Sequence, residues 1–208
     1  TIDNYTLLTE FIILCLNDPN INVNISLLTS LITLTPLERN SDNYKSLLSN
    51  ILLLIVDKYK IKKDKLSELI NSLLTFLLKY SLTIGELLYN IKSFPNDKSI
   101  VYKSSITEFI FVNLRKTKLS VVIECIEIII NVFSILIKDT NLDVKNCALS
   151  TLALVRKRVG RKRIELSDVD QCIGREVMEE IEQIARNVNY DRKYDDVEIE
   201  IEDESDEE

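Results

Sequence analysis

Apolar residues recur along the chain at the spacing of one helical face. In "LSELINSLLTFLL" (66–78), Leu or Ile occupies positions 66, 69, 70, 73, 74, 77 and 78, which is the i, i+3, i+4, i+7 pattern of a packed helix. No segment convincingly shows the alternation expected of a strand. Gly (3) and Pro (3) are scarce, which disfavours a sandwich or barrel with many tight turns. Similar stripes predict an all-α protein with helices over 5–16, 22–34, 43–56, 66–78, 84–94, 102–114, 120–137, 143–159 and 173–187.

An aspartate recurs between these predicted helices at nearly constant intervals. Asp18, Asp57, Asp97 and Asp139 are separated by 39, 40 and 42 residues, and a Val or Ile follows each Asp four or five positions later. A period near forty residues with two helices per unit is typical of HEAT and armadillo repeats. Each helix pair buries its apolar face against the next pair. The spacing therefore predicts a HEAT-repeat α-solenoid.

The turn residues divide into two groups. The Asp side chains can accept hydrogen bonds from the free N–H groups that begin the following helix, and the Val or Ile can pack into the core, so we interpret both as structural. Stacked repeats align their other turn residues along one edge, where Asp64 and Asp143 are the main acidic exceptions. A surface biased to one charge indicates an acidic partner. This predicted edge contains Asn22, Asn24, Lys58, Lys60, Lys62, Lys63, Lys98, Lys103, Lys145 and Asn146.

The net charge of −7 is unevenly distributed. Residues 191–208 contain 11 acidic and 2 basic residues, a net of −9, which leaves a net of +2 for the rest of the chain. Segments with few apolar residues and high charge do not bury enough surface to fold. We therefore expect a HEAT-repeat domain over 1–187 and an acidic disordered tail over 188–208.

The composition disfavours catalytic, metal and cofactor sites. The chain has no His, which excludes a Ser-His-Asp or Cys-His pair and any His-containing zinc site. It also lacks a Gly-rich phosphate loop. We expect a non-enzymatic protein without a cofactor or metal. The four cysteines are widely spaced and predict buried free thiols in a reducing compartment: Cys15, Cys125, Cys147 and Cys172.

Two stretches raise the alternatives of membrane and nucleic-acid binding. The apolar run 121–137 is shorter than the roughly 20 residues of a membrane span, and Glu124 and Glu127 lie on one helical face, so we interpret it as an amphipathic helix. The stretch "RKRVGRKR" (156–163) contains six basic residues and could contact phosphates. It is also typical of a helix C-terminus with Gly160 as a left-handed cap, and it could instead bind the acidic tail.

Four passages together resemble one known family. They are "CLNDPNINVNISLLTSLITL" (15–34), "SLTIGELLYNIKSFPNDKSIVYKSSITEFIFVNLRKT" (81–117), "IKDTNLDVKNCALSTLALVRKRVG" (137–160) and "LSDVDQCIGREVMEEIEQI" (166–184). Their order and spacing are similar to those of the TOG domain of microtubule polymerases and, less closely, of the CLASP proteins. The resemblance covers roughly residues 5–187.

This resemblance implies a function and a set of site residues. TOG domains are flat paddles of HEAT repeats that bind the αβ-tubulin heterodimer through their intra-repeat turns, without catalysis or cofactor. It implies that the partner is αβ-tubulin or a microtubule end, and that the protein is located in the cytoplasm on microtubules, the spindle or the spindle pole. The implied tubulin-binding residues are Val23, Asn24, Ile61, Lys62, Lys63, Lys98, Val101, Lys103, Val144, Lys145 and Asn146.

The chain departs from the family pattern in three respects. The family's first-repeat turn carries a Trp, whereas this sequence has none and begins at Thr1, near the expected start of a second repeat. We therefore expect either that the first repeat is absent from this sequence or that the domain is divergent and binds tubulin less tightly. Asn24 stands where the family often has a Lys, and Tyr102 stands at a frequently basic position. A HEAT-repeat scaffold or adaptor for another protein is the alternative interpretation, because helix periodicity does not separate the two.

Overall fold

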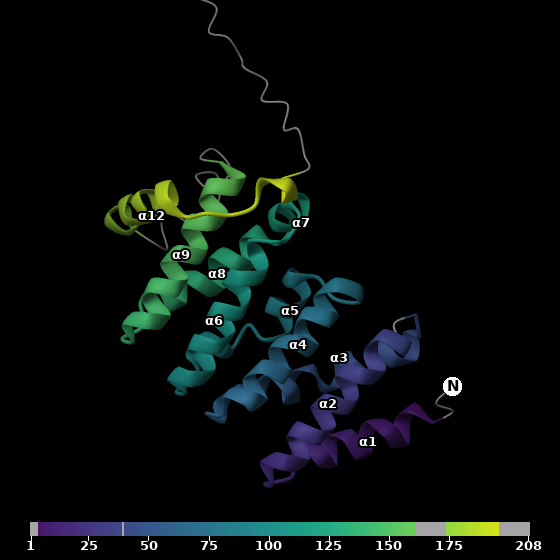
Figure 1. The fold of residues 1–208 in the computed structure, drawn as a ribbon. Helices are drawn as coiled ribbons and strands as arrows, with labels where there is room; N and C mark the ends of the chain where they lie inside the picture. Colours follow the sequence, from purple (N-terminus) through teal and green to yellow (C-terminus); the bar gives the residue numbers. More distant parts are fainter. Residues whose placement is uncertain (1–3, 39, 161–173, 196–208) are drawn as a thin grey trace, which may run out of the picture.

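The helices of this protein form two stacked layers. In the computed structural model, which describes residues 4–38, 40–160 and 174–195, every regular element is helical. One layer contains α1 (Tyr5–Leu16), α3 (Asp42–Asp57), α5 (Ile84–Asn90), α7 (Leu119–Glu124) and α8 (Ile126–Leu136). The other contains α2 (Ile21–Glu38), α4 (Asp64–Tyr80), α6 (Ile100–Leu114) and α9 (Leu142–Val159). Successive helix pairs stack in chain order (Figure 1), so the predicted all-α solenoid is confirmed.

The apolar faces of the stacked pairs form one continuous core. Leu28 of α2, Leu74 of α4, Ile110 of α6 and Ala153 of α9 belong to the same buried cluster. Burying one Leu or Ile side chain contributes about 1.5–3 kcal/mol to folding. The periodic apolar stripes of the sequence are thus the buried faces of the repeats.

Three of the four recurring aspartates organise the turns as predicted. The Oδ1 atoms of Asp18, Asp97 and Asp139 accept hydrogen bonds from backbone N–H groups two residues later, at 2.7, 2.8 and 2.9 Å. The acceptor side chain of the residue at this later position then caps the next helix, as Asn141 does for α9 with 3.1 Å bonds from Asp143 and Val144. Asp57 differs because it is the last residue of α3 and precedes the 3₁₀ turn η1 (Lys58–Lys60).

The helix predicted over 120–137 is divided at Cys125, so this prediction was wrong in detail. Cys125 adopts φ −104° and ψ 13° between α7 and α8. The bend lies against α5, where a Cβ atom added to Gly85 would come within 2.8 Å of the Cys125 Cβ. Helical periodicity continues through this bend, so the spacing of apolar residues does not reveal it.

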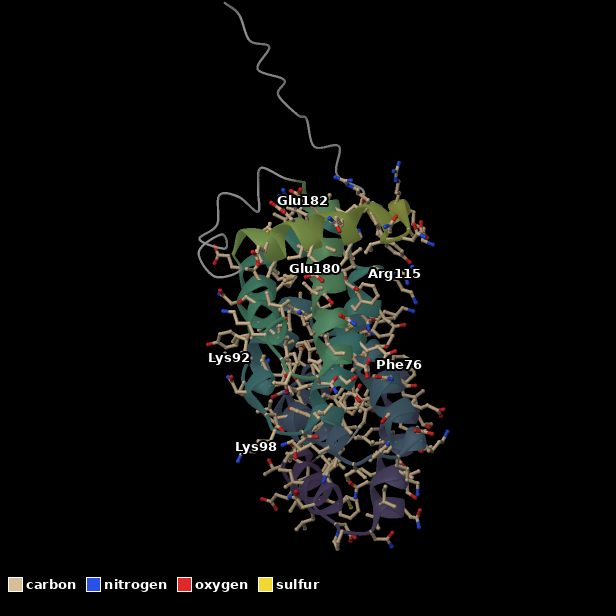
Figure 2. All side chains as sticks on the ribbon, turned by 90° about the vertical axis from the view of Figure 1, so that its left-hand side faces the viewer. Phe76, Lys92, Lys98, Arg115, Glu180 and Glu182 are labelled. Atoms are coloured by element: carbon tan, nitrogen blue, oxygen red, sulfur yellow. The ribbon has the colours of Figure 1, made fainter. Side chains whose placement is uncertain are left out.

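The C-terminal end of the array is covered by α12 (Arg175–Asn187), which lies across it (Figures 1 and 2). Ile181 and Ala185 of α12 are buried, and Arg156 Nη2 of α9 donates a 3.0 Å hydrogen bond to Glu182 Oε1. After α12, the chain crosses the C-terminal end of the array to the 3₁₀ turn η3 (Arg192–Tyr194). Among the described residues, no helix is both long and apolar enough to cross a membrane.

A candidate protein-binding edge

The four intra-repeat turns lie along one edge of the paddle. They connect α1 to α2, α3 to α4, α5 to α6 and α8 to α9, and they follow the lower left-hand side of Figure 1. Figure 2 views the molecule from that side, and its labelled Lys98 belongs to the third turn. We call these four connections the turn edge. Stacking therefore brings residues more than a hundred positions apart onto one surface.

The predicted site residues separate by exposure. Lys62, Lys63, Lys98 and Asn146 are exposed, and Ile61 is 37% exposed. Four others are half-buried: Val23, Val101, Lys103 and Lys145. The remaining two, Asn24 and Val144, are buried, so their side chains do not contribute to the surface of the turn edge.

Asn24 is a structural residue of the first turn. Its Nδ2 donates to the carbonyl oxygens of Cys15 and Asp18 at 3.2 and 3.0 Å. The amide therefore ties the end of α1 to the start of α2, while Val144 packs in the core of the fourth repeat. Only burial distinguishes these two residues from their exposed neighbours, and burial depends on how the repeats stack.

Two turn lysines are held by aspartates of the following turn. Lys60 Nζ lies 2.5 Å from Asp57 Oδ1 and 3.0 Å from Asp97 Oδ2, and it also lies 4.9 Å from the centre of the Tyr102 ring. Lys103 forms an ion pair with Asp139, which is largely buried. These contacts connect the second turn to the third and the third to the fourth. Lys60 and Lys103 therefore stabilise the edge, and their charges are already compensated.

These contacts shift the pKa values of three groups on the turn edge, Lys60, Asp97 and Asp139. Hydrogen bonds from the Ser99 amide and then from Lys60 lower the pKa of Asp97. Burial works to raise the pKa of Asp139, but hydrogen bonds from Lys103 and the Asn141 amide outweigh burial and lower it. Hydrogen bonds to Asp57 and Asp97 raise the pKa of Lys60. Lys60, Asp97 and Asp139 are thus charged at neutral pH.

Four other turn lysines are available to a partner. Within the described part of the chain, no carboxylate forms an ion pair with Lys62, Lys63, Lys98 or Lys145. The exposed acids Asp64 and Asp143 lie close to them in sequence. The basic bias predicted for the edge therefore comes from fewer lysines than the sequence suggested.

The turn edge also exposes an aliphatic side chain at each repeat, a feature that the sequence reasoning missed for three of the four turns. Ile100 is 50% exposed and Leu142 is 68% exposed, and both begin the second helix of their pair. Ile21 begins α2 and is half-buried, while Ile61 precedes α4. Ile21, Ile100 and Leu142 each follow the turn Asp by three positions, and this spacing could have identified them as turn-edge residues from the sequence.

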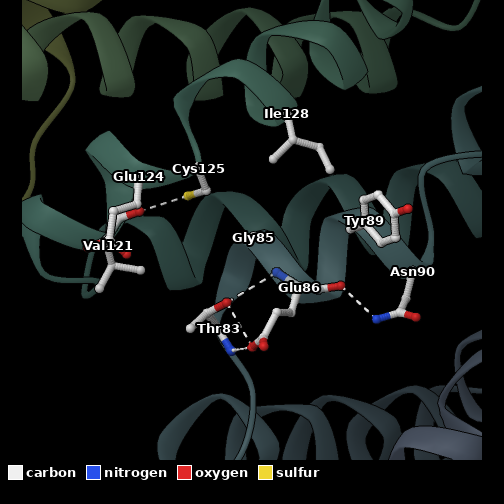
Figure 3. Close-up of a pocket in the computed structure, with 9 residues that line it drawn as sticks. All are labelled: Thr83, Gly85, Glu86, Tyr89, Asn90, Val121, Glu124, Cys125 and Ile128. Carbon is white, nitrogen blue, oxygen red and sulfur yellow. Dashed lines mark hydrogen bonds between the residues drawn. The ribbon is translucent and has the colours of Figure 1, made fainter.

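A hollow lies between α5 and the α7–α8 bend, in the layer that also contains α1 and α3. Figure 3 shows its lining, where Thr83 and Glu86 form the capping box of α5 and Tyr89 stands at one end. Burial raises the pKa of the Cys125 thiol to about 12, so this thiol is protonated at neutral pH and is a poor nucleophile. Among the described residues, no cluster of His, Cys, Asp or Glu could hold a metal ion.

The described half of the basic stretch 156–163 is used within the fold. Arg158 Nη1 donates to the Leu114 carbonyl oxygen at 2.6 Å, and its Nε and Nη2 atoms donate to Asp195 Oδ1 at 3.0 and 2.8 Å. Lys157 Nζ donates to the Val188 carbonyl oxygen at 2.8 Å. Gly160 has φ 86° and ψ 167°, a positive φ as predicted but outside the left-handed helical region. Residues 161–163 lie outside the described residues.

Comparisons with known proteins give one informative match. No protein-family profile and no curated protein matches the chain. A solved structure from work on the structural basis of microtubule plus-end tracking by XMAP215, CLIP-170 and EB1 superposes with a TM-score of 0.70. The match covers 90% of this chain and 78% of that one at 14% sequence identity. The fold is TOG-like. At 14% identity, the match supports the fold and the arrangement of its turns. It does not assign a function, because one fold can host many functions.

Proposed function

We propose that this TOG-like domain binds αβ-tubulin through its turn edge, as part of a regulator of microtubule growth. The observation that carries the proposal is the alignment of four turns on one edge, each with an aliphatic side chain at the surface and three of them with uncompensated lysines. Neither a core nor an ion-pair network accounts for Ile100, Leu142 or Lys98 at these positions. Apolar contact supplies binding energy, and the lysines favour a partner with an acidic surface.

The proposal involves a different set of residues from the one that the sequence predicted, because it replaces Asn24, Lys103 and Val144. It uses Ile61, Lys62, Lys63, Lys98, Val101, Lys145 and Asn146, it adds Ile21, Ile100 and Leu142, and it retains Val23 at the first turn. Lys103 acts by holding Asp139 and hence the fourth turn. We further propose that the protein acts at microtubules in the cytoplasm, since the similar structure comes from work on microtubule plus-end tracking.

The decisive experiment reverses the charge of the turn edge. Lys62→Glu combined with Lys145→Glu is expected to abolish co-elution with unpolymerised αβ-tubulin on size exclusion at low salt. Placing like charges against an acidic partner costs several kcal/mol. If wild type does not co-elute with tubulin under these conditions, the proposal is wrong.

A matched control changes the same net charge at the opposite edge. Lys79 lies in the last turn of α4, and Lys116 follows α6; both are exposed and lie away from the intra-repeat turns. Lys79→Glu combined with Lys116→Glu is therefore expected to leave co-elution unchanged. If this control fails as completely as the turn-edge variant, long-range charge rather than the turn edge determines binding.

A second candidate is a HEAT scaffold whose turn edge binds another acidic protein. The same exposed residues favour it, because fold and charge do not name the partner. It differs from the tubulin proposal in one outcome. Wild type would fail to bind αβ-tubulin, while the turn-edge lysines would still be needed for capture of the other protein.

A further inference from the structure

Basic side chains from three distant segments gather around Arg158, at the end of the helices that lies away from the turn edge. Arg158 Nη1 donates to the Leu114 carbonyl oxygen at 2.6 Å, and its Nη2 donates to the Tyr194 carbonyl oxygen at 3.3 Å. Lys157 Nζ donates to the Arg186 carbonyl oxygen at 3.4 Å. These contacts bring together the α6–α7 connection, the end of α9, and the end of α12 with η3. The cations of these segments form a surface that we call the C-terminal basic patch: Arg115, Lys116, Lys118, Lys157, Arg186 and Arg192.

The charges of the C-terminal basic patch are not compensated within the described part of the chain. Five of its six side chains are exposed, Arg115 is half-buried, and no described carboxylate forms an ion pair with any of them. Two carboxylates of this region are already paired with other cations. Asp191 lies 2.7 Å from Lys193 Nζ, and Asp195 lies 2.8 Å from Arg158 Nη2. Six like charges on one surface favour an acidic occupant.

We propose that residues 196–208 of this chain bind to the C-terminal basic patch. This acidic segment contains nine Asp or Glu residues and no Lys or Arg. It also starts within the patch. The residue before it, Asp195, accepts hydrogen bonds from Arg158 Nε and Nη2 at 3.0 and 2.8 Å. Asp195 is thus the first carboxylate of an acidic run that is held on this surface.

The covalent connection favours the acidic segment over an acidic partner from outside the chain. A ligand that is tethered through a short linker acts at an effective concentration on the order of millimolar. Here the attachment point, Asp195, lies among the cations themselves. A separate acidic protein would therefore have to displace the acidic segment before it could bind to the patch.

The distance between the two basic surfaces favours the patch over the turn edge. α9 begins at the turn edge and ends at the patch, and its 18 residues span about 27 Å at 1.5 Å per residue. An extended chain advances about 3.4 Å per residue, so roughly eight residues of the acidic segment would be used to reach the turn edge. All of its carboxylates are available at the patch. Binding there leaves the turn edge accessible, so this inference does not depend on the proposed function.

Zero-length carbodiimide cross-linking of residues 1–208 tests the inference, because this reagent joins a Lys amine to a carboxylate only when the two groups are in contact. At about 0.1 M salt, the expected products join residues 196–208 to Lys116, Lys118 or Lys157. These products are expected to be lost at about 1 M salt, where charges are screened beyond about 3 Å.

A mixture of unlabelled and ¹⁵N-labelled chains shows whether the binding occurs within one chain. The products from residues 196–208 are expected to join segments of the same isotope. The pair Lys60–Asp97, whose atoms lie 3.0 Å apart, is the internal reference for the reaction. The inference is overturned if the reference product forms without products at the patch. Products that join two different chains, or that go mainly to the turn-edge lysines, also overturn it.

Charge reversal within the patch provides a matched pair of variants. Lys118→Glu combined with Arg192→Glu is expected to lower the yield of products between residues 196–208 and Lys116 or Lys157 roughly tenfold, since like charges then meet. Lys62→Glu combined with Lys145→Glu changes the net charge equally at the turn edge and is expected to leave these products unchanged. Unchanged far-UV circular dichroism shows that the variants are folded. A patch variant that cross-links like wild type overturns the inference, whatever the result with tubulin.

Discussion

The two ends of the repeat array differ in how far the apolar side chains of their last helices, α1 and α12, are buried. At the C-terminal end, α12 buries Ile181 and Ala185 against α9 and presents Glu176, Glu179 and Glu180 outward. At the N-terminal end, α1 exposes Leu7, Phe11 and Leu14 beside an uncharged groove between α1 and α2. A solenoid needs a polar outer face at each end to remain soluble as a single unit. Among the described residues, α12 therefore covers the apolar face of α9, whereas no described helix covers the outer face of α1.

Disrupting the packing of α12 on α9 should produce the largest loss of stability. Ile181→Ala removes a buried side chain of α12 and is expected to lower the free energy of unfolding by about 2–5 kcal/mol, because the cavity forms between α12 and α9. Urea unfolding monitored by circular dichroism measures this. Leu14→Ala at the other end is the matched control, with an expected change below about 0.5 kcal/mol at 1 μM. Equal losses at both ends would contradict the contrast.

The Arg158 contacts should contribute less to stability, since they hold only the short segment after α12, residues 188–195. Arg158→Met retains much of the side-chain volume but removes the hydrogen bonds to Asp195 and to the Leu114 carbonyl. The expected loss is about 1–3 kcal/mol. Lys193→Met, at an exposed position of η3, serves as the control. A change in the free energy of unfolding below about 0.5 kcal/mol for Arg158→Met would show that the segment 188–195 does not contribute to stability.

The smallest expected effect concerns acid pH and the turns between the two ends. The pKa values of Asp97 and Asp139 are lower in the folded chain than the roughly 3.9 of an unfolded Asp. Their stabilisation is complete above that pH and is lost as the pH falls through the folded pKa values, because the unfolded chain then binds more protons. Thermal melts between pH 5 and 2 measure this loss.

The variant Asp139→Asn isolates the contribution of the fourth turn to acid stability from the contributions of the other carboxylates. It removes the charge that Lys103 pairs with but can keep an acceptor for the Asn141 amide. We expect the variant to be less stable at pH 7 and to lose less stability on acidification than wild type. An identical acid profile for the two proteins would show that the ion pairs between turns do not couple the repeats.

Local patterns predicted most of the fold. The spacing of Leu and Ile predicts each helix because the same residues that repeat along the chain also face the core. The turn aspartates were interpreted correctly at three positions because an Asp side chain bonds to its own backbone two residues later. The bend at Cys125 was not predictable from spacing, since it depends on the close approach of α5 at Gly85.

The surface of the candidate site was harder to predict than its location. The chain alone indicates that the turns align, but it does not reveal that Asn24 turns inward or that Lys103 pairs with Asp139, 36 residues away. The exposed Ile100 and Leu142 were missed because apolar residues at helix starts are usually interpreted as core. Exposure depends on distances between repeats, which the sequence of one repeat does not contain.

The sequence by itself determined the helices, the forty-residue period and therefore the alignment of the turns on one edge, because these features arise from contacts within or between adjacent repeats. Tertiary structure alone decided which turn residues are exposed, which lysines are already compensated and how α12 covers α9. The physical reason is that burial and charge pairing depend on neighbours brought together by stacking. In a turn such as residues 139–146, local hydrogen bonds determine the backbone conformation. The neighbouring repeats determine which of its side chains are exposed and which charges are paired.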